Sequence, residues 1–230
     1  MKLNQVVVAC MMGVGALGSA SAADITLSGT HLSYTFSDAV LGLFGTPSVV
    51  GDALSWSPSA FTAKTFSDIA FVDSSFVVTI TANAGWSLTS FSLTEGGDYA
   101  YYGAGNLVAA GGELRVTNLA STGTTSISDI SMTGPALTAQ SSIVPFPTQK
   151  WTAAADLSLT TTKASATIEN LLFALAADSE AGDYAFIQKK NVLLDVGVAA
   201  VTTVPEPETY ALMLAGLGTI AFLARRRRRD

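Results

Sequence analysis

Cysteine and histidine are almost absent from this sequence, and each occurs once, as Cys10 and His31. A single cysteine cannot close an intramolecular disulfide, and the two residues cannot supply the several Cys or His ligands of a zinc site. A Ser-His-Asp triad would have to use His31, yet no G-x-S-x-G turn accompanies it. We therefore predict no catalytic residue and no cofactor, and we interpret His31 as a surface or packed side chain.

Charge is also scarce, since charged residues make up 13% of the chain, while Ala, Ser, Thr, Gly and Val are abundant. This composition is typical of β-strands. Apolar side chains alternate along several runs, which predicts that one set faces a core: Leu32, Tyr34, Phe36, Phe76, Val78, Ile80, Leu114, Val116, Leu157, Leu159, Ala164, Ala166, Ile168, Val192, Leu194, Val196 and Val198. We predict an all-β fold, an antiparallel β-sandwich with a jelly-roll-like topology.

Irregular positions interrupt this alternation. The pattern changes phase between Leu88 and Phe91, which predicts a β-bulge. Glycine-rich clusters predict turns at 83–85, 95–98, 111–112, 121–123 and 182–183. Residues 169–177 fit a helical turn or a strand equally well, because a short apolar run has no decisive period.

The C-terminal end has three ordered elements. Val204, Pro205, Glu206 and Pro207 form an extended acidic segment, since proline disfavours helix at these positions. The uncharged residues 210–224 predict a transmembrane helix of about 22 Å, which is short for a hydrocarbon core of about 30 Å. A basic block follows and predicts a stop-transfer signal that leaves this end in the cytoplasm: Arg225, Arg226, Arg227, Arg228 and Arg229.

The N-terminal end predicts a signal peptide over residues 1–22. Lys2 is a minimal positive region, residues 6–17 are apolar, and Ala20 and Ala22 fit a small-x-small cleavage site that leaves Ala23 first. A lipoprotein box ending at Cys10 is the alternative, although few apolar residues precede it. Removing both ends leaves one domain, residues 23–203, between the signal peptide and the tail at 204–230.

The tail resembles the PEP-CTERM sorting signal, through Val204-Pro205-Glu206-Pro207, the apolar helix and the terminal arginines. The resemblance implies that an exosortase at the inner membrane recognises the Pro-Glu-Pro motif and cleaves or transfers the chain. It also implies export to the cell surface or the extracellular matrix, beside exopolysaccharide and biofilm production. An ordinary C-terminal membrane anchor is the alternative, although it needs no such motif and is usually longer.

The predicted domain is acidic, because its 15 acidic and six basic residues give a net charge of −9. This charge excludes nucleic acid as a partner and suits a divalent cation or a neutral polysaccharide. Asp178, Glu180 and Asp183 are a weak candidate calcium site, which a plain surface turn explains equally well. Five aromatic residues could form a sugar-stacking platform, but they are also ordinary core residues: Trp86, Tyr99, Tyr101, Tyr102 and Trp151.

Two functions remain at this stage. The first is a non-enzymatic exported surface or matrix protein, sorted by an exosortase, contacting the membrane through residues 210–224 and binding polysaccharide. The second is a secreted glycan hydrolase with paired carboxylates, for which Asp68 with Asp73 and Glu95 with Asp98 are the nearest pairs. The scarcity of histidine and cysteine and the missing catalytic motifs favour the first.

Overall fold

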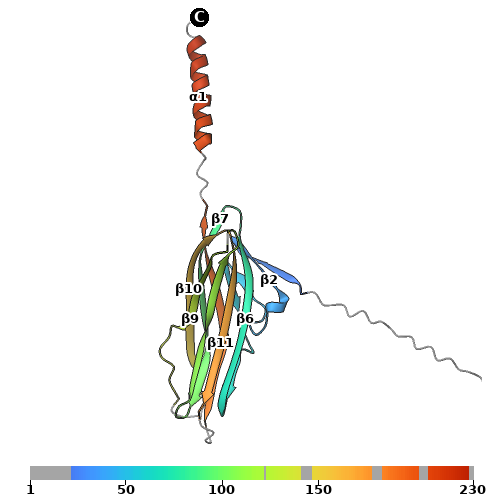
Figure 1. The fold of residues 1–230 in the computed structure, drawn as a ribbon, viewed down its shortest axis with the longest axis vertical. Helices are drawn as coiled ribbons and strands as arrows, with labels where there is room; N and C mark the ends of the chain where they lie inside the picture. The colour runs from blue at the N-terminus through green and yellow to red at the C-terminus, as the bar shows by residue number, and fades with distance from the viewer. Residues whose placement is uncertain (1–21, 122, 141–146, 178–182, 202–206, 228–230) are drawn as a thin grey trace, which may run out of the picture.

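A computed structural model of the chain describes residues 22–121, 123–140, 147–177, 183–201 and 207–227. Twelve strands, one 3-10 turn and one helix lie in these residues (Figure 1). The first half holds β1 (Asp24–Ser28), β2 (Leu32–Ser37), η1 (Asp38–Val40), β3 (Ser48–Val50), β4 (Ala53–Trp56), β5 (Thr62–Thr65) and β6 (Asp68–Ala82). The second holds β7 (Trp86–Tyr102), β8 (Leu107–Asn118), β9 (Thr125–Met132), β10 (Gln149–Thr161), β11 (Lys163–Ala176), β12 (Tyr184–Ala200) and α1 (Pro207–Arg227).

The strands form two packed antiparallel layers that share one hydrogen-bonded path. Layer A has the order β1-β2-β6-β11-β8-β9, and layer B has the order β10-β7-β12-β4-β3, with β5 also paired to β12. β9 joins the layers, because it pairs with β8 over most of its length and with β10 near Met132. The all-β antiparallel prediction is confirmed. The jelly-roll-like topology is not shown, because the described strands follow one continuous hydrogen-bonded path rather than two separate sheets.

The core lies between the two layers and follows the predicted alternation. Side chains that were predicted to face inward are buried on β2, β6, β8, β11 and β12, and those at Leu157, Leu159 and Val198 are half-buried. The predicted bulge in β7 is also confirmed, since the register against β12 shifts between Leu88 and Ser90. Both Leu88 and Phe91 can therefore face the core. Residues 169–176 continue β11 as a strand, which settles the open choice between helix and strand.

Two predicted turns are wrong. Residues 95–98 lie within β7, and Gly111 and Gly112 lie within β8. The reason is that neighbouring strands pack closely at these glycines. A Cβ at position 97 would lie 1.8 Å from the Gln188 carbonyl oxygen, and a Cβ at position 112 would lie 1.9 Å from the Glu169 carbonyl oxygen. Gly97 and Gly112 thus allow two backbones to approach each other inside the sheet. The predicted turns at 83–85 and around Gly123 are confirmed.

The tail forms α1, which contains the predicted helical residues 210–224. β12 ends beside the β6–β7 turn, where the Val201 backbone N–H donates to the Gly85 carbonyl oxygen at 2.8 Å. The expected membrane span is not found: in the part of the chain that the structure describes, no helix has the length and apolar character needed to cross a membrane. The signal-peptide residues before Ala22 lie outside the described ranges.

Candidate functional site

The predicted sorting residues lie where the domain gives way to the tail. Val204, Pro205 and Glu206 fall outside the described residues, in the interval between the end of β12 and the first residue of α1, Pro207. Of the arginine block, Arg225 to Arg227 are helical, and Arg228 and Arg229 lie outside the described residues. For the predicted cleavage site, Ala22 and Ala23 precede β1, and Ala20 is not described.

The fold does not bring the acids of the two predicted pairs together at one site, and the predicted calcium site lies partly outside the described residues. Glu95 is buried in the core, whereas Asp98 is bound by lysines on layer B, so these two acids do not face one cleft. Asp73 lines a surface pocket that does not include Asp68. Asp178 and Glu180 lie outside the described residues. Among the described residues, no cluster of three or more His, Cys, Asp or Glu side chains is placed to hold a metal ion.

The predicted aromatic platform is not assembled as one exposed surface: Tyr99 and Trp151 are buried, and Trp86, Tyr101 and Tyr102 are half-buried. Tyr99 is buried and donates to Gln149 Oε1 at 2.7 Å, and the Trp151 indole N–H donates to the Gln188 carbonyl oxygen at 3.1 Å. Tyr99 and Tyr101 share one side of β7, as predicted, with ring centroids 6.3 Å apart. The more exposed aromatic rings lie elsewhere, at Phe66 and Phe71.

His31 is a packed histidine that ties one end of the sandwich together. Its Nδ1 lies 2.7 Å from Asp52 Oδ2, and its ring packs at a tilt against the Trp86 ring, with 3.9 Å between centroids. Burial acts to raise the pKa of Asp52, but hydrogen bonds from the His31 backbone and ring outweigh it and hold that pKa below its usual range. The pair bridges the β1–β2 turn and the β3–β4 turn, so its role is to join the layers.

The core contains one polar centre that was not predicted. Glu95 on β7, Asn170 on β11 and Lys189 on β12 are at most 3% exposed. The Lys189 ammonium donates to Glu95 Oε2, and it donates to Asn170 Oδ1 at 2.5 Å. The Asn170 amide donates to Glu95 Oε1 at 2.6 Å. All three side chains thus satisfy one another in a closed triangle that spans both layers.

Strand alternation explains why these polar residues face inward. Asn170 continues the buried series Ala164, Ala166 and Ile168 on β11, and Glu95 continues Phe91 and Leu93 on β7. On β12 the register shifts between Lys189 and Asn191, so Lys189 and Val192 both face the core. The alternation contained a signal for Glu95 and Asn170, whereas the bulge that turns Lys189 inward has no clear sequence signature.

Aromatic rings and burial set the electrostatics of this centre. The Lys189 Nζ lies 5.4 Å from the Phe61 ring centroid and 5.7 Å from that of Trp151, within cation–π range. Burial lowers the pKa of Lys189 to about 8, while the Glu95 carboxylate acts in the opposite direction. Near neutral pH, Lys189 therefore has a larger fraction of its side chain in the neutral amine form than an exposed lysine has.

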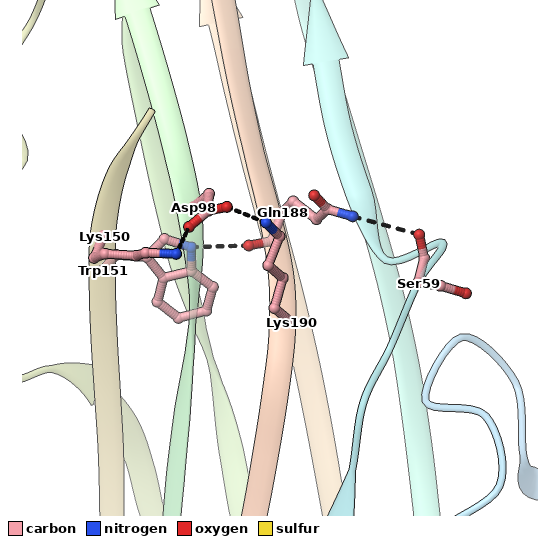
Figure 2. Close-up of polar contacts among 6 residues, drawn as sticks. All are labelled: Ser59, Asp98, Lys150, Trp151, Gln188 and Lys190. Carbon is pink, nitrogen blue, oxygen red and sulfur yellow. Dashed lines mark hydrogen bonds and ion pairs between the residues drawn. The ribbon is translucent and has the colours of Figure 1, made fainter. Parts of the chain in front are cut away.

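A second ionic group fixes the bulge from outside the core. Figure 2 shows Asp98 between Lys150 of β10 and Lys190 of β12, and both lysines donate to its carboxylate. Gln188 accepts from Trp151 through its backbone and donates to the Ser59 carbonyl oxygen at 3.4 Å (Figure 2). These contacts tie β10, β7 and β12 together on both sides of Lys189, so they hold its strand in the bulged register.

A polar pocket of about 460 Å³ opens on β6, β8 and β11. Asp73, Glu113 and Glu169 line it with two serines and Leu171, and Gly112 and Asn170 also contribute. Glu113 accepts two hydrogen bonds from the Arg115 guanidinium, at 3.0 and 2.6 Å. Asn170, a member of the buried centre, is therefore also one of the residues that line this pocket.

Comparison with known proteins identifies the tail. No curated protein matches the chain in sequence. Residues 203–229 match the family of the PEP-CTERM protein-sorting motif. The match takes in the predicted sorting residues from Val204 to Pro207, the helical segment and the whole arginine block. The chain therefore carries at its C-terminus the PEP-CTERM signal of exosortase-sorted exported proteins, as the sequence predicted.

Proposed function

We propose that this chain is an exported, non-enzymatic surface or extracellular-matrix protein that an exosortase processes at the inner membrane. The match of the PEP-CTERM motif to residues 203–229 carries this proposal. The order of the elements supports it, because the Pro-Glu-Pro residues follow the last strand of the domain and end at Pro207, the first residue of α1.

The tail contacts the membrane in this proposal through residues 210–224 and the arginines that follow. The described side chains of α1, from Ala211 to Ile220, are exposed and not packed on the domain. They include Leu212, Leu214 and Ile220. An exposed apolar helix followed by a basic block suits a membrane interface, since arginine side chains can reach the head groups while the apolar residues enter the lipid.

Polysaccharide association in a biofilm matrix is the second element of the proposal. Phe66 is 62% exposed and Phe71 is 68% exposed. Phe66 packs on Tyr184 at 5.1 Å between ring centroids, and the Lys64 ammonium lies 5.0 Å from the Phe66 centroid. Exposed rings beside a hydrogen-bond donor suit the apolar face and the hydroxyl groups of a sugar ring. A glycan hydrolase is the alternative, supported by the carboxylates that line the pocket on β6, β8 and β11.

The sorting proposal predicts the mass of the exported protein. In a host that has an exosortase, the chain should lose the residues after the Pro205–Pro207 segment, because that segment is the recognition motif. Intact-mass spectrometry of the exported protein measures this loss. A variant with Pro205→Ala and Pro207→Ala should keep its tail in the same host. A wild-type mass that retains residues 208–230 in an exosortase-positive host would contradict the proposal.

A further inference from the structure

Three groups that can react with one another are enclosed in the core. Lys189 provides an amine, Asn170 provides a carboxamide, and Glu95 provides a carboxylate that contacts both. Lys189 Nζ lies 2.5 Å from Asn170 Oδ1, so the amine is already beside the carbonyl group of the amide. None of the three is exposed by more than 3%, so bulk water is excluded from the reacting atoms.

A buried ion pair at this place is costly as a structural element. Removing two charges from water is expensive, and apolar residues of the same volume often stabilise a core at least as well. Here the charges lie among buried side chains, with Phe61 and Trp151 beside the ammonium. The backbone N–H of Lys189 also donates to the Phe61 carbonyl oxygen at 2.9 Å, which fixes the lysine and that ring together. The centre therefore has the rigid, dry geometry that favours reaction between its members.

We propose that Lys189 and Asn170 join through an intramolecular isopeptide bond, with Glu95 carrying the proton. Burial supports the reaction, because the lowered pKa of Lys189 brings the nucleophilic neutral amine within reach near neutral pH. Glu95 contacts the attacking nitrogen through Oε2 and the leaving nitrogen through Oε1. One carboxylate can therefore accept a proton from the amine and deliver a proton to the departing ammonia.

The reaction balances without an oxidant or a cofactor. The Lys189 ammonium first gives a proton to Glu95, and the amine lone pair then attacks Asn170 Cγ to form a new C–N bond. A proton moves from Nζ through Glu95 to Nδ2, the Cγ–Nδ2 bond breaks, and ammonia leaves. Of the three protons of the original ammonium group, one leaves with ammonia, one stays on the isopeptide nitrogen and one stays on Glu95. The pocket lined by Gly112 and Asn170 offers ammonia a way out.

The bond would covalently join the two layers of the sandwich. Asn170 belongs to layer A and Lys189 to layer B, and they are 19 positions apart in the chain. A cross-link at this separation restricts the unfolded chain in the same way that a disulfide does. It would supply such a restraint in a domain that contains no cysteine. This role is independent of how the tail is sorted.

Peptide mass spectrometry of the full-length folded protein tests the proposal. After incubation at pH 8, trypsin should fail to cut after Lys189, and the peptide of residues 164–190 should be lighter by about 17 Da, the mass of ammonia. Cleavage after Glu169 and Glu180 with a Glu-specific protease should then leave two halves, residues 170–180 and residues 181–190, joined to each other. A succinimide at Asn170 would show the same mass loss, but its halves would separate, and this result would overturn the proposal. An unmodified peptide from folded wild-type protein would also overturn it.

Substitutions distinguish the roles of the three residues. Glu95→Gln keeps the shape of the side chain and removes the proton acceptor, so the variant should fold, by circular dichroism, and show no joined halves. A joined Glu95→Gln variant would overturn the role of Glu95. Asn170→Asp should link with loss of water, about 18 Da, to a product of the same mass as the linked wild type. Lys64→Ala, which alters an exposed lysine of β5, should keep the bond.

Discussion

At the scale of single residues, neighbouring side chains keep the buried carboxylates of this domain ionised. Asp98 is an example, because its carboxylate is nearly buried and two lysines donate to it. Burial opposes ionisation, and the hydrogen bonds and charges of Lys150 and Lys190 outweigh it, so its pKa lies below the usual range. Lys150 is largely exposed, so solvent weakens that contact and the stabilisation is smaller than for a fully buried pair.

We predict that Asp98→Asn lowers the free energy of unfolding at pH 7 by about 1–3 kcal/mol, since both lysines lose a charged acceptor. Urea denaturation measures this change. Asp156→Asn, at an exposed position of β10, is the matched control and should change it by less than about 0.5 kcal/mol. Equal effects of the two substitutions would contradict the importance of the Asp98 contacts.

The same carboxylates predict the acid response of the domain. The pKa values of Asp52 and Asp98 are lower in the folded state than in the unfolded chain, where aspartate titrates near about 3.9. Their stabilisation is therefore present above that pH and is lost as the pH falls through the folded-state values. The wild type should lose stability below about pH 4, and Asp98→Asn should show a smaller loss over that range.

At the scale of elements, the glycines in the middle of strands have different roles although they are neighbours in sequence. A Cβ at Gly112 would overlap the Glu169 carbonyl oxygen of β11. The backbone of Gly112 also has a φ of +151°. A Cβ at Gly111 meets no atom within 4 Å. β8 and β11 pair along most of their lengths, so a clash at Gly112 acts on the centre of layer A.

We predict that Gly112→Ala lowers the free energy of unfolding by about 3 kcal/mol or more, because the two strands must separate to accept the methyl group. Gly111→Ala should be neutral or slightly stabilising, since alanine restricts the unfolded chain and meets open space. Thermal unfolding followed by circular dichroism compares the two variants. Similar melting temperatures for both would show that the β8–β11 approach is not tight.

At the scale of the whole molecule, the sorting tail and the exposed aromatic residues lie at opposite ends of the long strands. The tail leaves at the end of the sandwich where β6 turns into β7, while the aromatic residues Phe66 and Tyr184 lie near the opposite ends of the long strands. β12 alone, with 17 residues, spans about 50 Å between these ends. A domain held at the membrane by its tail would present its exposed rings far from the tail.

We predict that the mature domain binds exopolysaccharide from its own host and releases no reducing ends. Phe66→Ala with Phe71→Ala should weaken binding by about tenfold, since each ring contributes about 0.5–1.5 kcal/mol. Val50→Ala, which alters an exposed aliphatic residue, is the control. Glycan binding and reducing-end assays measure both properties. Release of reducing ends that disappears in Glu113→Gln or Glu169→Gln would favour the hydrolase alternative.

The sequence by itself determined the β-class, the inward faces of most strands and the sorting tail. These properties are local: a period of two places side chains on alternate faces of a strand, and the tail is a contiguous motif. The Leu88–Phe91 bulge was predictable for the same reason, because both apolar residues require burial.

Tertiary structure alone decided what the interior glycines and polar residues do. The sequence around Gly97 and Gly112 predicted turns, whereas both glycines lie inside strands. Each is a glycine because a neighbouring backbone leaves no room for a side chain, and this neighbour cannot be identified from the local sequence. The triangle of Glu95, Asn170 and Lys189 brings together residues up to 94 positions apart, and a bulge turns the lysine inward. Strand pairing and layer packing set these distances, and neither can be derived from local alternation.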